Sequence, residues 1–212
     1  ARWGDRLPAF LSALQRTSDA FLDLGVVSGD GDLASYVGPV NYSSEINYRY
    51  EDWFQEVTGT EKGSVITEIY LGFRDRPHFT IAVRRGEGAD AVILRSALSP
   101  ERLSEYLTTL EGASEVHAAI VNPRGILQVA TPRLGEVLQP SLFTPPPSPE
   151  RGFVPGARLT GRPDYAYAWL NQTPWALVVM NADGGAEPGA SLFRNTFFLA
   201  TVAVFLHMGM VI

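Results

Sequence analysis

Pro77-His-Phe-Thr-Ile-Ala-Val-Arg84 and Asp90-Ala-Val-Ile-Leu-Arg-Ser-Ala97 form the stretch of sequence that decides the fold. Both runs are rich in Val, Ile, Thr and aromatic side chains, which favour extended backbone, and two glycines between them supply turn residues. We therefore predict two adjacent antiparallel strands joined by a hairpin. A third strand-like run, residues 64–71, precedes them, so the centre of the chain predicts three consecutive strands.

Helical and strand-like patterns alternate outward from this centre. Apolar residues at spacings of three, four and seven predict a helix over 5–24, with Leu7, Leu14 and Phe21 on one face. Further helices are predicted at 48–58 and 99–112, and further strands at 35–40, 115–121, 126–130, 158–161, 165–171 and 175–180. Consecutive hairpins with helices gathered to one side predict an α+β fold with one central antiparallel sheet.

The last sixteen residues, 197–212, contain no Asp, Glu, Lys or Arg. A bilayer core needs about 20 apolar residues in helical form, and counting from residue 191 gives that span. We expect a transmembrane helix over 191–212, cut short by the end of the sequence, and a linker at 183–190 before it. A buried C-terminal core helix is the alternative, but the segment is apolar on all sides, which favours the membrane.

Composition excludes several classes of function. The formal net charge of -6 and the lack of a basic stripe give no support to nucleic-acid binding. The absence of cysteine excludes thiolate zinc sites, iron–sulfur clusters and cysteine nucleophiles. There is no Gly-rich phosphate loop and no Gly-x-Ser-x-Gly elbow, and the three histidines lie far apart in sequence. We expect no cofactor, no metal site and no catalytic residue in this chain.

Aromatic and arginine residues gather at 48–54, 69–74 and 76–79. Alternate side chains of a strand share a face, so Ile93 and Arg95 share one face, and Tyr165, Tyr167 and Trp169 share another. Aromatic walls with one or two arginines suit a small-molecule pocket that holds an anion. The alternative is that the aromatics are core and the arginines surface, which is the commoner case for any single residue.

A series of short motifs runs in one order through the chain. They are Tyr36-Val-Gly-Pro39, Tyr50-Glu-Asp-Trp-Phe54, Glu68-Ile-Tyr-Leu-Gly-Phe-Arg74, Pro77-His-Phe79, Ile81-Ala-Val-Arg84, Ile93-Leu-Arg95, Asn122-Pro-Arg-Gly-Ile-Leu-Gln128 and Thr173-Pro-Trp-Ala-Leu-Val-Val179. This series resembles the extracytoplasmic Cache sensor domains of bacterial two-component histidine kinases. The resemblance implies a PAS-like fold, with a long N-terminal helix, an antiparallel sheet bearing a ligand pocket, and a second membrane span leading to a cytoplasmic kinase.

Only one such sheet fits, so we expect a stalk helix at 1–24 and a single Cache domain at 25–182. The resemblance places Trp53 and Tyr70 at pocket-lining positions. Many amino-acid-binding members have an arginine two residues before that tryptophan, where this chain has Glu51. The alternatives for binding a ligand carboxylate are therefore Arg74, His78 and Arg95. The expected ligand-binding residues are Trp53, Tyr70, Arg74, His78, Arg95 and Tyr167.

We therefore expect the periplasmic small-molecule-sensing domain of a histidine kinase in the cell inner membrane. The sequence does not identify the ligand, and a carboxylate is one candidate. A homodimer is expected, with Leu7, Leu14 and Phe21 as the candidate interface. The chain itself is not expected to be an enzyme. The alternatives are the sensor region of a chemoreceptor or cyclic-dinucleotide signalling enzyme, and a membrane-anchored hydrolase that uses a histidine such as His78.

Overall fold

The computed structural model describes residues 3, 5–41, 45–72, 75–113, 116–156, 161–171 and 173–181. The chain divides into two compact units, Ala1–Pro100 and Glu101–Ile212, and each unit contains its own five-stranded antiparallel sheet. The α+β class is confirmed, whereas the prediction of one central sheet is wrong. Alternation along a strand fixes which side chains share a face, but it does not fix which other strand is the partner. The grouping of 25–182 as one sensor domain stays a prediction.

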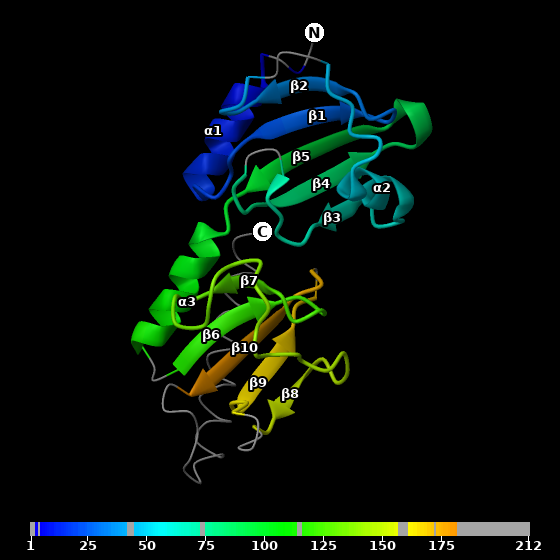
Figure 1. The fold of residues 1–212 in the computed structure, drawn as a ribbon. Helices are drawn as coiled ribbons and strands as arrows, with labels where there is room; N and C mark the ends of the chain where they lie inside the picture. Colours follow the sequence, from blue (N-terminus) through cyan, green and yellow to red (C-terminus); the bar gives the residue numbers. More distant parts are fainter. Residues whose placement is uncertain are drawn as a thin grey trace. The chain divides into compact units, whose positions relative to one another are not determined.

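The first sheet has the strand order β2-β1-β5-β4-β3 (Figure 1). Its strands are β1 (Leu24–Ser28), β2 (Leu33–Val37), β3 (Ser64–Ile66), β4 (Phe79–Arg85) and β5 (Val92–Leu98). The hairpin predicted at the centre of the sequence is confirmed, because β4 pairs with β5 from Phe79 opposite Leu98 to Arg85 opposite Val92. β3 pairs with β4, so the three predicted strands are adjacent. β1, which the sequence analysis missed, pairs with the other edge of β5.

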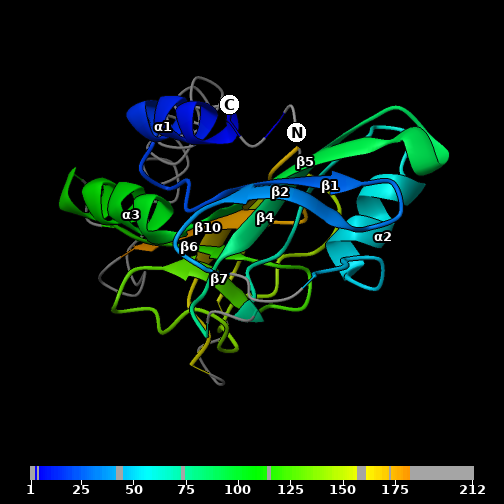
Figure 2. The same cartoon turned by 90° about the horizontal axis from the view of Figure 1, so that it is seen from above.

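Two helices cover opposite faces of this sheet, α1 (Leu7–Thr17) and α2 (Asp52–Gly59) (Figure 2). Val26 of β1 packs with Leu7 and Leu11 of α1. The next residue, Val27, packs with Trp53 of α2. Neighbouring side chains of a strand point to opposite faces, so β1 contributes to both cores.

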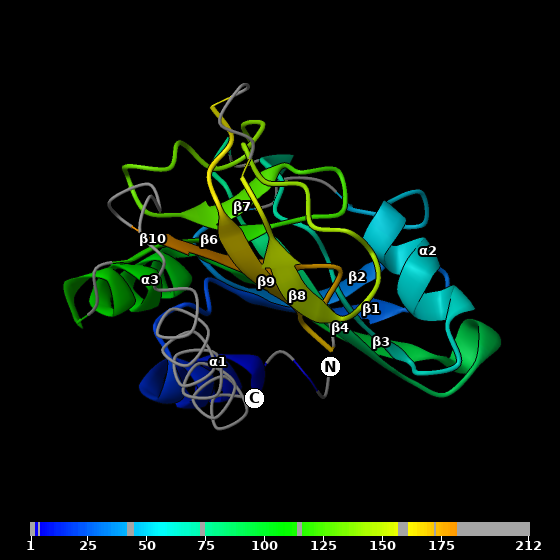
Figure 3. The ribbon, with the colours of Figure 1, turned by 90° about the horizontal axis from the view of Figure 1, so that it is seen from below.

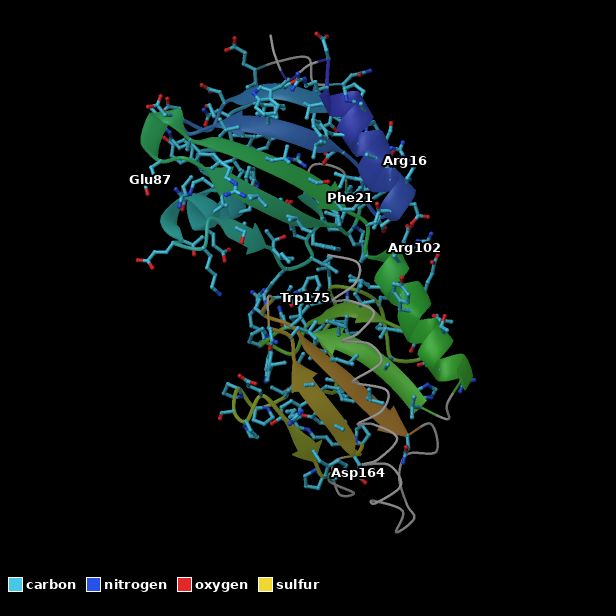
Figure 4. All side chains as sticks on the ribbon, turned by 180° about the vertical axis from the view of Figure 1, so that it is seen from behind. Arg16, Phe21, Glu87, Arg102, Asp164 and Trp175 are labelled. Atoms are coloured by element: carbon cyan, nitrogen blue, oxygen red, sulfur yellow. The ribbon has the colours of Figure 1, made fainter. Side chains whose placement is uncertain are left out.

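α1 is shorter than the helix predicted over 5–24. Ser18 is in extended conformation after the last helical residue, and its hydroxyl accepts a hydrogen bond from the Ala20 amide at 3.3 Å. Beyond it the backbone pairs with the end of β5, where the Leu22 amide donates to the Ala97 carbonyl at 2.9 Å. Phe21 lies just past the helix end (Figure 4) and forms a bridge with Leu98. The strand edge therefore offers hydrogen bonds that compete with further helix.

The predicted face of Leu7, Leu14 and Phe21 packs inside its own unit. All three belong to one apolar cluster that includes Leu24 of β1. Leu7 is only 1% exposed. This face stabilises the first unit, and Leu7 is not available to a second copy of the chain.

The second unit begins with α3 (Glu101–Ala113), which lies beside β6 and β7 (Figure 3). Its sheet has the order β7-β6-β10-β9-β8. The strands are β6 (Val116–Val121), β7 (Leu127–Ala130), β8 (Arg151–Val154), β9 (Tyr165–Trp169) and β10 (Ala176–Asn181), with Trp175 just before β10 (Figure 4). The four predicted strands that correspond to β6, β7, β9 and β10 are confirmed.

The proline-rich stretch at 140–156 contains β8 and accepts hydrogen bonds from side chains of β9. Trp169 Nε1 donates to the Pro146 carbonyl at 2.8 Å, and the Tyr167 hydroxyl donates to the Pro149 carbonyl at 3.2 Å. Tyr165, Tyr167 and Trp169 pack in one apolar cluster, which confirms that they share a face. The strand predicted at 158–161 falls mostly outside the described residues.

The predicted linker at 183–190 and transmembrane helix at 191–212 also lie outside the described residues. Within the described part of the chain, no helix has the length and apolar character that crossing a bilayer requires.

Candidate functional site

The structure places four of the six predicted ligand-binding residues in the first unit: Trp53, Tyr70, His78 and Arg95. Trp53, His78 and Arg95 are buried, and Tyr70 is half-buried. Tyr167 belongs to the second unit, and Arg74 lies outside the described residues. The candidate site therefore lies in the first unit.

Arg95 is the buried cation of this site. It lies on β5 between Gly25 of β1 and Ala82 of β4, on the face toward α2, where Ile93 also packs. Its Nη1 donates to both carboxylate oxygens of Asp23, at 2.8 and 3.0 Å. The predicted shared face of Ile93 and Arg95 is thus confirmed, and Arg95 is a buried, paired arginine.

Asp23 is a residue of the candidate site that sequence reasoning missed. Its side chain is fully buried, and its Oδ1 also accepts a hydrogen bond from the Ala97 amide at 2.7 Å. Asp23 stands in the otherwise apolar run from Phe21 to Val27. A carboxylate in such a run is a signal for a buried ionic partner, because a lone buried charge is strongly unfavourable.

Tyr48 joins this ion pair to the aromatic side of the site. Its hydroxyl accepts a hydrogen bond from Arg95 Nη2 at 3.4 Å, and the guanidinium carbon lies 5.6 Å from its ring centroid. The Tyr48 ring meets the Trp53 ring at 5.2 Å. Trp53 is itself a core residue of α2, packed with Ala82 and other sheet residues. Trp53 therefore positions Tyr48 as well as filling the core.

Tyr70, His78 and Thr80 form the other side of the site. The Tyr70 and Thr80 hydroxyls hydrogen-bond at 2.8 Å, and the Tyr70 and His78 rings lie 4.4 Å apart. His78 Nδ1 lies 2.9 Å from the Arg76 carbonyl, which only accepts, so Nδ1 carries the proton of that bond. A paired backbone bridge between Tyr70 and His78 holds both residues.

Electrostatics link the two sides of the site. Burial raises the pKa of Tyr70 above its ordinary value, and the hydrogen bond to Thr80 and the Arg95 charge act in the opposite direction. The carboxylates of Glu51 and Asp23 reinforce the rise in pKa. Tyr70 is therefore neutral at physiological pH and lies within electrostatic reach of Arg95.

We call these residues the polar cluster: Asp23, Tyr48, Tyr70, His78, Thr80 and Arg95. The cluster offers hydrogen-bond donors, acceptors and aromatic faces, which suits binding of a small polar molecule. Among the described residues, no group of His, Asp and Glu is arranged to hold a metal ion. His78 Nδ1 bonds a backbone carbonyl, whereas a carboxylate orients the base of a hydrolase triad.

Tyr167 lies in a different environment. Its side chain is 1% exposed and packs with Phe143 and Tyr165 in the core of the second unit. Its hydroxyl bonds the Pro149 carbonyl. Its observed role is to hold the proline-rich stretch onto β9.

No protein-family model matches the chain, and no curated protein matches it in sequence. Solved structures do match it. An extracellular domain described as that of a histidine kinase, rpHK1S-Z16, is similar with a TM-score of 0.61 at 16% identity, over 82% of this chain and 77% of that one. An extracellular ligand-binding receptor from Desulfohalobium retbaense is similar with a TM-score of 0.64 at 14% identity, over 84% and 33% of the two chains.

The ligand-binding domain of the Pseudomonas fluorescens chemoreceptor CtaA, solved with L-alanine, is similar with a TM-score of 0.55 at 16% identity. That match covers 84% of this chain and 81% of the chemoreceptor domain.

The chain has a Cache-like fold.

Its similar structures are extracellular sensor domains of histidine kinases and chemoreceptors, so the fold implied by the sequence motifs is confirmed. In this Cache-like fold the polar cluster occupies the face of the first sheet that α2 partly covers. The cluster is the strongest candidate for a ligand site among the described residues.

Proposed function

We propose that this chain is the extracytoplasmic small-molecule-sensing domain of a membrane-bound sensor histidine kinase. The observation that carries the proposal is the buried polar cluster, in which an arginine, a carboxylate and two tyrosines are held together inside a small unit. Even a paired buried arginine and carboxylate contribute little net stability, because the cost of their desolvation offsets their attraction, which favours a functional role for the pair. The Cache-like fold supports the same function.

The proposed ligand contacts are Tyr70, His78 and Arg95, with Trp53 positioning Tyr48 beside them. Arg74 and Tyr167 stay in the proposed set. The similar chemoreceptor domains were solved with amino acids such as L-alanine and GABA, so small molecules of that size are the first to test.

The test is a thermal-shift screen of the chain against small carboxylates, amines, amino acids and sugars. We expect at least one compound to raise the melting temperature of the wild type. Arg95→Gln and Tyr70→Phe should each lower the affinity for that compound by about tenfold or more, since each removes a polar contact to a bound group. Arg85→Gln is the matched control, because Arg85 is an exposed arginine on the adjacent strand β4. Equal binding by all three variants contradicts the proposed site.

Membrane attachment and a homodimer belong to the same proposal. With Leu7 buried in its own unit, the side of α1 left for a second copy is the one that carries Phe10, which is 52% exposed. Phe10→Glu should weaken self-association in analytical ultracentrifugation and leave the melting temperature nearly unchanged. An unchanged dimer would remove this side of α1 from the interface.

A chemoreceptor sensor is the second candidate, because several of the similar structures are chemoreceptor ligand-binding domains. The same binding site would suit a histidine kinase, a chemoreceptor or a cyclic-dinucleotide signalling enzyme. Fusing the chain to a reporter kinase and to a reporter chemoreceptor output tests the two in parallel. Ligand-dependent output from the kinase fusion alone supports the first proposal.

A further inference from the structure

Asp23 already neutralises Arg95, one of the residues predicted from the sequence to bind a ligand carboxylate. The Arg95 Nη1 donates to both Asp23 oxygens, and the two side chains are 9% and 0% exposed. Asp23 is held in place independently, by the Ala97 amide at 2.7 Å and by a hydrogen bond from the Ser96 hydroxyl to the Asp23 carbonyl. The pair is thus a fixed part of the first unit and not an incidental surface contact.

Both signs of charge act on Tyr70, where Arg95 has the largest single charge effect and two carboxylates oppose it. One guanidinium, of Arg95, and two carboxylates, of Asp23 and Glu51, act on the Tyr70 hydroxyl. A ligand anion placed beside Arg95 would therefore meet a cation whose charge is already balanced, together with a second carboxylate. In a buried setting such like-charge contact is costly, and the ligand's own desolvation adds to the cost.

We propose that Asp23 is the specificity-determining residue of this site, which binds ligands without net negative charge and rejects simple carboxylate anions. The inference rests on the proposed sensor function and deepens it by naming the charge class of the ligand. A zwitterion or an amine can place its ammonium group toward the carboxylates and the tyrosine rings, where cation–π attraction adds to the ionic one. A monocarboxylate or dicarboxylate has no such group.

The wild-type chain is tested first, by calorimetric titration with L-alanine, ethanolamine, acetate and succinate. Binding of alanine or ethanolamine with affinity about tenfold or more above that of acetate and succinate supports the inference. Tighter binding of acetate or succinate overturns it, while leaving the proposed sensing function intact. Binding of none of the four counts against this part of the proposed function, and the variants below then decide the inference.

Two variants, of which Asp23→Asn is isosteric, change the charge of the site in opposite directions. Asp23→Asn leaves Arg95 without its counter-charge, and we expect it to gain succinate binding by about tenfold or more and to lose ethanolamine binding. Arg95→Gln leaves the carboxylates in excess, and we expect the preference for ethanolamine over succinate to widen, even though the binding of each ligand that contacts Arg95 weakens. A purely structural role for Asp23 would lower the stability without changing the order of the ligands. An unchanged order in a folded Asp23→Asn variant therefore overturns the inference.

Asp30→Asn is the matched control. Asp30 forms an ion pair with Arg49 at 3.1 Å, but both side chains are more than half exposed. The variant removes the same charge from the same unit, and we expect the ligand order of the wild type. A shift in ligand order equal to that of Asp23→Asn would show that net charge alone is responsible, and would overturn the assignment to Asp23. Should neither site variant fold, the wild-type titrations alone decide.

Discussion

Tyr70 of the polar cluster has a pKa that its surroundings shift. Its pKa lies above the ordinary value of 10.0, chiefly because of burial. The folded state therefore keeps the proton more tightly than the unfolded state, and this contribution to the free energy of unfolding is complete below about pH 10. It is lost as the pH rises through the raised pKa. We expect the stability of the wild type to fall above about pH 10 and to fall less steeply in Tyr70→Phe.

Denaturant unfolding at a series of pH values from about 8 to 11 measures this slope. Tyr50→Phe is the control, because Tyr50 is 86% exposed in the same unit. Its curve should run parallel to that of the wild type. A Tyr70→Phe curve that also runs parallel would show that the hydroxyl keeps its ordinary pKa.

Single residues also show how far sequence reasoning reaches at this scale. Strand alternation placed Arg95 on the face of Ile93, and the structure confirms it. Asp23 was missed, because its role depends on a partner 72 residues away. Its isolation in an apolar run was visible, but no local pattern names the cation that balances it.

At the scale of elements, Arg84 of β4 secures the C-terminal end of α2. It donates to the carbonyls of Val57 at 3.1 Å, Thr60 at 3.0 Å and Gly86 at 2.7 Å. Carbonyls at a helix end lack intrahelical donors, and a cation there is favoured by the helix dipole. We expect Arg84→Met to lower the free energy of unfolding by about 1–3 kcal/mol in urea titrations.

Arg85→Met provides the comparison, since Arg85 is exposed and follows directly in sequence. Its effect should stay within about 0.5 kcal/mol. Equal losses in the two variants would mean that the bonds to the α2 terminus contribute nothing measurable.

α1 offers a second test at this scale. Leu11 is 7% exposed and packs with Leu24 and Val26 of β1, whereas its neighbour Phe10 is 52% exposed. Leu11→Ala should cost about 2–4 kcal/mol, because it removes buried methyl groups and leaves a cavity. Phe10→Ala should cost far less, despite losing the larger side chain. A reversed order, measured by chemical denaturation, would show that α1 packs through its other side.

At the scale of the whole molecule, the described residues of each unit form a five-stranded sheet of their own. β1 to β5 all lie within Ala1–Pro100, and β6 to β10 all follow it. A unit with its own sheet and its own apolar clusters has what independent folding requires. We expect the fragment of residues 1–100 to unfold cooperatively on heating and to keep dispersed amide resonances. A fragment without a cooperative transition would show that the first unit depends on the second.

The sequence by itself determined the local features of this protein. The β4–β5 hairpin, α2, α3 and the shared face of Tyr165, Tyr167 and Trp169 all follow from residue spacing and turn residues. The ordered motifs also predicted the Cache-like fold. The hairpin, the helices and the shared strand face depend on neighbours in the chain, so the sequence records them directly.

Only the tertiary structure decided the rest. It decided that the ten strands of the described residues form two sheets, that the chain leaves α1 at Thr17 to pair with β5, and that Asp23 meets Arg95. Each of these is a choice of partner between distant segments. Alternation assigns a side chain to a face, but several strands present equivalent backbone edges, and only packing of the whole unit selects among them.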